Sequence, residues 1–201
     1  MLLHALIPAS RANGPGLRAV VFFQGCKIGC GGCFNPKTHS FHGEQIKVDA
    51  VAKAVLRARQ EHPLEGITFS GGEPMQQANS LLQLIQGLHH QAPELTFGMF
   101  SGYAEHELAK GQYWICSDNS SEQHRKHLWE EIRGNLDFAI LGSFNQAQPS
   151  NLPLRTSRNQ VLRLFTDRYS PSDFSEQLTE INIRDDGQVE LTGFPTLGLP
   201  W

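Results

Sequence analysis

Short apolar runs and amphipathic stretches alternate along most of the chain. Runs rich in Val, Ile, Leu and Phe, bounded by turn residues, predict buried strands. These runs are residues 17–24, 66–69, 95–100, 137–141 and 161–166. Apolar positions three and four residues apart predict helices between the strands. The predicted helices are residues 48–61, a stretch around 81–88, residues 124–132 and a segment around 171–177.

This order of elements is typical of parallel sheets with crossover helices. A complete eight-unit barrel needs about 250 residues. We therefore expect the 201-residue chain to form an α/β fold, a partial (β/α) barrel of five or six units with a parallel sheet. Apolar alternation on either side of Asp186 and Gly187 predicts a small C-terminal β-hairpin. No repeat or linker marks a boundary, so residues 1–201 are predicted to form one domain.

Composition and charge narrow the possible classes of protein. With 39% hydrophobic and 18% charged residues, the chain is typical of globular proteins. A net charge of -3 without a run of Lys or Arg disfavours a dedicated nucleic-acid binder. No apolar stretch approaches the roughly 20 residues that cross a bilayer. Residues 1–10 lack the basic start of a signal peptide, and His4 and Pro8 interrupt their apolar run, so we expect a cytoplasmic protein.

Three of the four cysteines, Cys26, Cys30 and Cys33, form a CxxxCxxC motif directly after a predicted strand. Disulfides between such close neighbours would close very small loops and leave one cysteine over. Structural zinc sites use four ligands, whereas three cysteines on a glycine-rich loop suit a 4Fe-4S cluster that keeps one iron open. A zinc site or simply buried thiols are the alternatives. Cys116 lies outside the motif, so one cluster is the limit.

Further short motifs accompany the cysteines. GPGLR at 14–18 precedes them, TFSGGEP at 68–74 ends the second predicted strand, SGY at 101–103 follows the third, and LRTSRNQ occupies 154–160. In this order the motifs resemble the radical S-adenosylmethionine superfamily. Within it they resemble the activating enzymes of glycyl-radical enzymes, of the anaerobic ribonucleotide reductase and pyruvate formate-lyase type. The resemblance spans roughly residues 13–160, and Gly32 directly before Cys33 fits that branch.

The resemblance implies a mechanism and a set of binding residues. A 4Fe-4S cluster on the three cysteines would bind S-adenosylmethionine, whose reductive cleavage gives a 5′-deoxyadenosyl radical that abstracts a hydrogen atom. No catalytic residue is implied beyond the cluster and the cofactor. Backbone carbonyls around Gly71 and Gly72 are expected to face the cofactor closely, and Phe34 to pack on its adenine. The residues expected to bind the cofactor are Phe34, Asn35, Ser70, Gly71, Gly72, Glu73, Pro74, Ser101, Gly102 and Arg155.

The same resemblance implies the partners. The expected substrate is a backbone glycine of a partner glycyl-radical enzyme, and the expected electron donor is a flavodoxin or a ferredoxin. One alternative keeps the radical chemistry but modifies a small molecule or a peptide in a biosynthetic pathway. Another is a non-catalytic iron-sulfur or zinc module. For Ser101 and Arg155 a loop cap and a solvated charge are the alternatives. Residues 110–133 and 193–201 match no motif, and substrate preference is expected there.

Overall fold

The computed structural model describes residues 1–116, 119–174, 178–183 and 189–194. Its centre is a six-stranded sheet with the strands in sequence order from β1 to β6. Strands β2 to β5 are parallel to one another, and β1 and β6 pair antiparallel at the two edges. The strands are β1 (Leu3–Ser10), β2 (Arg18–Phe23), β3 (Gly66–Gly71), β4 (Thr96–Ser101), β5 (Phe138–Leu141) and β6 (Val161–Leu164). A separate antiparallel hairpin consists of β7 (Thr179–Ile183) and β8 (Val189–Gly193).

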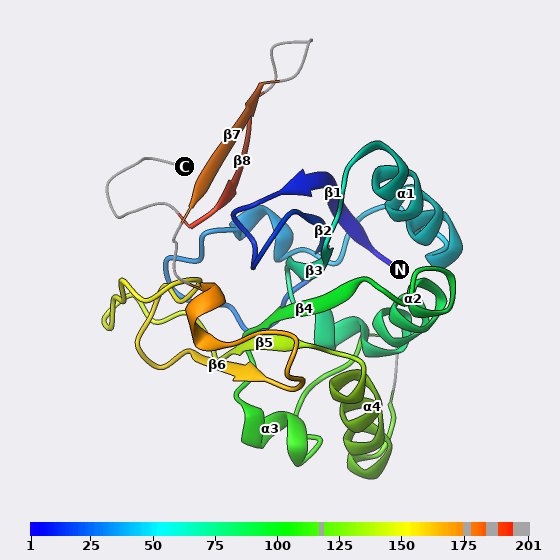
Figure 1. The fold of residues 1–201 in the computed structure, drawn as a ribbon. Helices are drawn as coiled ribbons and strands as arrows, with labels where there is room; N and C mark the ends of the chain where they lie inside the picture. Colours follow the sequence, from blue (N-terminus) through cyan, green and yellow to red (C-terminus); the bar gives the residue numbers. More distant parts are fainter. Residues whose placement is uncertain (117–118, 175–177, 184–188, 195–201) are drawn as a thin grey trace.

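Helices cover one face of the sheet. Figure 1 shows α1, α2 and α4 along one side, while the β7–β8 hairpin projects beyond the other. The helices are α1 (Val48–Glu61), α2 (Ala78–Gln91), α3 (Glu105–Ala109) and α4 (Glu122–Gly134). Three short 3-10 helices are η1 (Pro36–Thr38), η2 (Pro74–Gln77) and η3 (Pro171–Phe174).

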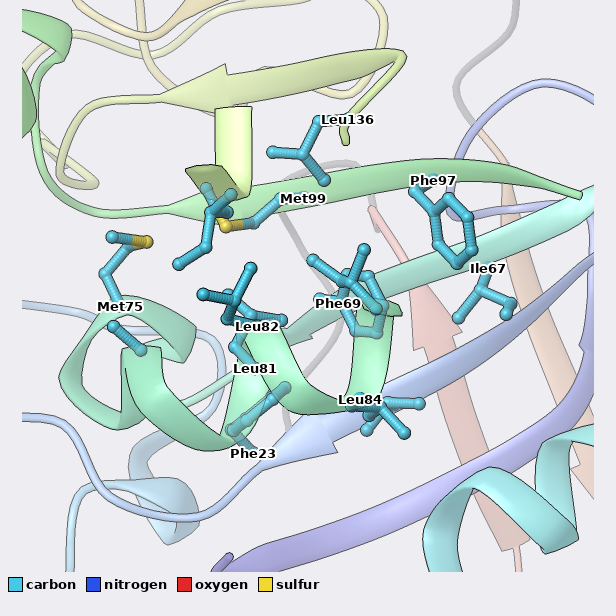
Figure 2. Packing of buried hydrophobic residues seen from close by; sticks show 14 of the residues in the cluster. Phe23, Ile67, Phe69, Met75, Leu81, Leu82, Leu84, Phe97, Met99 and Leu136 are labelled. Atoms are coloured by element: carbon cyan, nitrogen blue, oxygen red, sulfur yellow. The ribbon is translucent and has the colours of Figure 1, made fainter. Parts of the chain in front are cut away.

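The main core lies between α2 and the sheet. Leu81 and Leu84 of α2 are fully buried and belong to the same hydrophobic cluster as Phe69 and Phe97 of the strands (Figure 2). The rings of Phe69 and Phe97 stack with centroids 6.2 Å apart. Leucine and isoleucine recur on one face of α2, which is the pattern that buries a helix against a sheet. This core holds the parallel strands in register, so that their C-terminal ends meet at one edge.

On the opposite face of the sheet, a network of hydrogen bonds fills the space beside the N-terminal ends of the parallel strands. Arg18, the first residue of β2, is 0% exposed there. Its guanidinium donates hydrogen bonds to Thr68 Oγ1 (2.8 Å), Thr96 Oγ1 (2.9 Å) and the Tyr169 hydroxyl (3.0 Å). It also donates to backbone carbonyls and lies 5.1 Å from the centroid of the Phe138 ring. Arg18 therefore ties together the starts of β2, β3 and β4 and leaves the C-terminal ends of the strands open.

The mostly parallel α/β sheet and the C-terminal hairpin are confirmed. The helix predicted at 48–61 has the observed bounds of α1. Asp186 and Gly187, where the hairpin turn is predicted, lie outside the described residues. The helix predicted around 171–177 is the 3-10 helix Pro171–Phe174 in its described part. The curvature of a partial barrel stays a prediction.

The direction expected for the last strand of the sheet is wrong. β6 runs antiparallel to β5, and Leu141 pairs with Val161. Parallel neighbours need a crossover, usually a helix, and the connection from 142 to 160 contains none. The chain therefore starts β6 at the end where β5 stops. The sequence analysis also missed β1, an edge strand in which Pro8 falls at a shift in register between Ile7 and Ser10.

Candidate functional site

The loops beyond β2, β3, β4 and β5 meet around an open cleft at the C-terminal edge of the parallel strands. This is where ligands bind in such sheets. The cleft brings together residues from segments far apart in the sequence. Of the residues singled out in the sequence, those that line it are Cys33, Phe34, Asn35, Ser70, Gly71, Gly72, Ser101 and Gly102.

The lining of this cleft does not include Cys26, Cys30, Glu73, Pro74 or Arg155. Pro74 is buried as the first residue of η2. Arg155 donates its backbone N–H to Leu152 O (3.1 Å), and its Nε is buried without a hydrogen-bond partner. Its neighbours line the cleft in its place. Gln160 Oε1 accepts hydrogen bonds from the backbone N–H of Thr156 (2.8 Å), and both residues face the cleft.

Aromatic side chains form much of the wall, and the sequence analysis expected only Phe34 among them to bind the cofactor. Phe34 lies against Phe144 with ring centroids 4.9 Å apart, and Phe100 against Phe194 at 5.4 Å. Phe22 and Phe100 sit near the ends of otherwise buried strands and face away from the helices, so the alternation of strand faces was a usable signal. The further lining residues are Asn13, Phe22, Phe100, Ile140, Gly142, Phe144, Thr156, Gln160, Thr192, Gly193 and Phe194.

The cysteines lie in the loop after β2, here called the cysteine loop (residues 25–35). Cys26, Cys30 and Cys33 are half-buried free thiols. Gly29 and Gly32 have φ values of 66° and 71°, which give the loop the left-handed turns between the cysteines. The backbone N–H of Asn35 donates to Cys33 Sγ (3.4 Å), a type of contact that tunes cluster sulfurs. Soft sulfur donors on one short glycine-rich loop fit an iron-sulfur cluster.

Burial favours the protonated thiols of Cys26 and Cys30. Burial raises the pKa of Cys26 to about 11, and the pKa of Cys30 is also raised by burial. Among the described residues no cluster of His, Cys, Asp and Glu is already arranged around a metal position. Metal binding therefore has to displace protons and draw the thiolates together.

Gly71 and Gly72 approach the chain's own backbone closely. The N–H of Gly72 donates to Phe23 O (2.8 Å), and the N–H of Glu73 donates to Gly25 O (2.9 Å). A Cβ on Gly72 would lie 2.3 Å from Gly25 O. Gly25 directly precedes Cys26, so a side chain at residue 72 would push the start of the cysteine loop.

Gly72→Val should therefore weaken both cluster loading and cofactor binding. We expect a loss of about tenfold or more in each, the effect typical of disturbing the support of a metal site. Iron per chain after anaerobic reconstitution and equilibrium binding of S-adenosylmethionine measure the two effects. Gly87→Val is the control, because a Cβ on Gly87 meets nothing within 4 Å. Parent-like iron content and affinity in Gly72→Val would contradict the account.

Glu73 joins two of the loops from inside. Its side chain is 1% exposed. Ser101 Oγ and the N–H of Met75 donate to Oε1 (2.8 and 2.9 Å), and the N–H of Gly102 donates to Oε2 (2.7 Å). Burial nevertheless raises the pKa of Glu73 to about 7. The carboxyl group thus positions the Ser101–Gly102 turn and does not itself reach the cleft.

The raised pKa predicts how stability depends on pH. The unfolded carboxyl loses its proton near pH 4.5, whereas the folded one keeps it to about 7. The contribution of Glu73 to the free energy of unfolding is therefore fully present below pH 4.5 and is lost as the pH rises to about 7. Its size over that range is about 3 kcal/mol.

Glu73→Gln should make the free energy of unfolding less dependent on pH between pH 4.5 and about 7. Denaturant unfolding of the cluster-free chain at several pH values measures the slope. The exposed Glu61 of α1 offers a matched control, and Glu61→Gln should keep the slope of the parent. An unchanged slope in Glu73→Gln would show that another group titrates.

The comparisons with known proteins agree with this site. A family model described as "4Fe-4S single cluster domain" matches residues 12–163. The chain belongs to this 4Fe-4S single-cluster family. The match covers the cysteine loop, the Gly71–Gly72 turn, the Ser101 turn and most of the connection to β6.

Named relatives point to one kind of enzyme. The anaerobic ribonucleoside-triphosphate reductase-activating protein of Vibrio cholerae is 28% identical over 171 residues, covering 83% of this chain and 99% of its own. That of Haemophilus influenzae is 29% identical over 164 residues, covering 79% and 94%. The pyruvate formate-lyase-activating enzyme of Clostridium pasteurianum is 32% identical over 111 residues, covering 51% and 46%.

These findings confirm the resemblance to the radical S-adenosylmethionine activating enzymes. They also confirm the enzyme class and the expected cofactors, a 4Fe-4S cluster and S-adenosylmethionine. In the part of the chain that the structure describes, no helix has the length and apolar character to span a membrane.

Proposed function

We propose that this chain activates a partner glycyl-radical enzyme by abstracting a hydrogen atom from a backbone glycine of the partner. One observation carries the proposal. Cys33, Gly72 and Ser101, from three motifs separated by long stretches of sequence, line the same cleft at the ends of parallel strands. The relatives described above are named for activating anaerobic ribonucleoside-triphosphate reductase or pyruvate formate-lyase.

The predicted site residues in and around the cleft have different tasks in this proposal. Cys26, Cys30 and Cys33 hold the cluster. Bound there, the cluster and S-adenosylmethionine supply a 5′-deoxyadenosyl radical once an electron enters. The carbonyls of Gly71 and Gly72 accept hydrogen bonds from the amino group of the cofactor, with Ser70 beside them. Asn35 binds nearby, Ser101 and Gly102 complete the lining of the cleft, and Glu73 and Pro74 shape the turn from behind. Arg155 does not line the cleft and directly precedes the lining residue Thr156.

The aromatic walls keep water from the radical. Phe34 and Phe144, whose rings are tilted by 52° to each other, offer an apolar face on which the adenine ring can pack. Phe100 and Phe194 pack together on another part of the wall. A reactive carbon radical is protected when its surroundings offer few groups with which it can react.

The partner approaches from the side of the sheet that the helices leave open. The end of the β7–β8 hairpin reaches the cleft, because Thr192 and Gly193 line it. Figure 1 shows the hairpin projecting beyond the sheet, where a docked protein would meet it. A flavodoxin or a ferredoxin would supply the electron, and a cytoplasmic location suits both partners.

Detection of the product radical tests the proposal. The reconstituted chain, a reductant and S-adenosylmethionine are mixed anaerobically with a glycyl-radical enzyme from the same genome. We expect the electron paramagnetic resonance doublet of a glycyl radical in the partner, and none when its target glycine is replaced by alanine. Cofactor cleavage without a radical on any such partner would favour a small-molecule or peptide substrate. Zinc binding without cleavage would favour a structural module.

A further inference from the structure

The segment after α3 matched no motif, yet hydrogen bonds and ring contacts connect it to the cysteine loop. Residues 111–116, here called the aromatic segment, include Tyr113, Trp114 and Cys116. The N–H of Trp114 donates to the hydroxyl of Tyr103 (3.2 Å), and the N–H of Cys116 donates to Gln76 O (2.7 Å). The segment is therefore held by the turn after β4 and by η2, both of which belong to the loops around the cleft.

The buried side chain of Gln76 extends this connection to the cysteine loop. Its Nε2 donates to the Tyr103 hydroxyl (2.8 Å), and its Oε1 accepts from the backbone N–H of Lys27 (2.8 Å). Lys27 follows Cys26 directly in the sequence. A continuous chain of hydrogen bonds thus runs from Trp114 through Tyr103 and Gln76 to the backbone beside the first cysteine.

A second set of contacts holds the same part of the loop. The Lys27 ammonium lies 3.5 Å from the centroid of the Trp114 ring, a cation-π contact. Trp114 packs edge-on against Phe41, with centroids 5.2 Å apart. Phe41 in turn lies against Gly25, where a Cβ would come within 2.4 Å of its ring. Lys27, Gln76, Tyr103 and Trp114 also line one hollow in the surface.

We propose that Tyr103 and Gln76 are positioning residues that couple the aromatic segment to the cysteine loop and hold Cys26 where the cluster binds. Hydrogen bonds from residues outside the ligand set orient the groups that bind a metal. The role concerns the cluster and does not depend on which partner the enzyme activates. It also gives the aromatic segment a task other than the substrate preference expected from its sequence.

Removal of one hydroxyl tests this role with little change in shape. Tyr103→Phe leaves Gln76 Nε2 and the Trp114 N–H without their shared acceptor, and it leaves the bond from Lys27 to Gln76 in place. Tyr113→Phe is the matched control. Its buried ring lies 5.8 Å from that of Tyr103, but its hydroxyl donates to Arg125 O (2.6 Å), away from the cysteine loop.

The first readout uses the cluster-free chain. The rate at which iodoacetamide alkylates Cys26, followed by peptide mass spectrometry, reports how firmly the loop is held. Tyr103→Phe should raise this rate about tenfold, the factor that loss of one or two buried hydrogen bonds produces. Tyr113→Phe should leave it at the value of the parent. This readout tests the coupling even if reconstitution fails to load iron. Failure to load iron would count against the cluster assignment and not against the coupling.

The second readout uses the loaded chain. Tyr103→Phe should speed the loss of iron to a chelator by about tenfold or more and shift the midpoint potential of the cluster. Gln76→Leu, which removes both side-chain hydrogen bonds, should do at least as much. Tyr113→Phe should change neither property. Equal alkylation rates, iron loss and potentials for Tyr103→Phe and Tyr113→Phe would overturn the proposal.

Discussion

Cys30→Ala should leave the reconstituted chain without a stable 4Fe-4S cluster and without turnover. Cys30 is the middle cysteine of the proposed ligand set, and its carbonyl accepts the N–H of Cys33 (3.3 Å) within the same turn. A cluster with one open iron needs a thiolate on each of its other irons. The two remaining cysteines of the motif cannot supply three thiolates. The methyl group of alanine, at a half-buried position of the loop, does not bind iron.

Iron and sulfide per chain, the visible absorption of the cluster and cofactor cleavage measure this effect. Cys116→Ala is the control. Cys116 contacts η2 through its backbone N–H, which alanine retains. We expect Cys116→Ala to load iron and to cleave the cofactor as the parent does. A Cys30→Ala chain with a full cluster and full activity would remove Cys30 from the ligand set.

Arg18→Met should lower the free energy of unfolding by about 3 kcal/mol or more. This loss is larger than that of a substitution at an exposed position. Methionine fills a similar volume but donates no hydrogen bond. Thr68, Thr96 and Tyr169 would lose the cation that their oxygens face, together with the backbone carbonyls of Pro15 and Ile67. Unpaired polar groups in a fully buried site cannot recover these bonds from water.

Denaturant unfolding of the cluster-free chain measures this loss. The exposed Arg57 of α1 provides the comparison, and Arg57→Met should change the free energy of unfolding by no more than about 0.5 kcal/mol. Equal effects of the two substitutions would show that Arg18 does not hold the starts of the parallel strands together.

The parallel part of the fold was predictable because its signals are local. Buried parallel strands appear in the sequence as continuous apolar runs, and β3 and β4 fall where such runs occur. The apolar spacing of α1 stands out equally well. Loops that follow neighbouring parallel strands meet at one edge of the sheet, which brings the motifs at Cys33, Gly72 and Ser101 together.

The remaining features depend on contacts that no local pattern encodes. The direction of β6 follows from the path of the connection after β5. The contact between Gly72 and Gly25 O depends on the register of β2 against β3. Glu73 turns inward because donors from the next strand's loop face it. The cleft residues Thr192 and Phe194 come from the C-terminal hairpin, which reaches the cleft only in three dimensions.

Formation of 5′-deoxyadenosine is the direct readout of radical chemistry in this chain. The anaerobically reconstituted and reduced chain is given S-adenosylmethionine, and the product is quantified by mass spectrometry beside a chain in which Cys26, Cys30 and Cys33 are all replaced by alanine. We expect 5′-deoxyadenosine and methionine in equal amounts from the parent and none from the triple variant. A fully iron-loaded parent that forms no 5′-deoxyadenosine, with or without a glycyl-radical partner, would contradict this expectation.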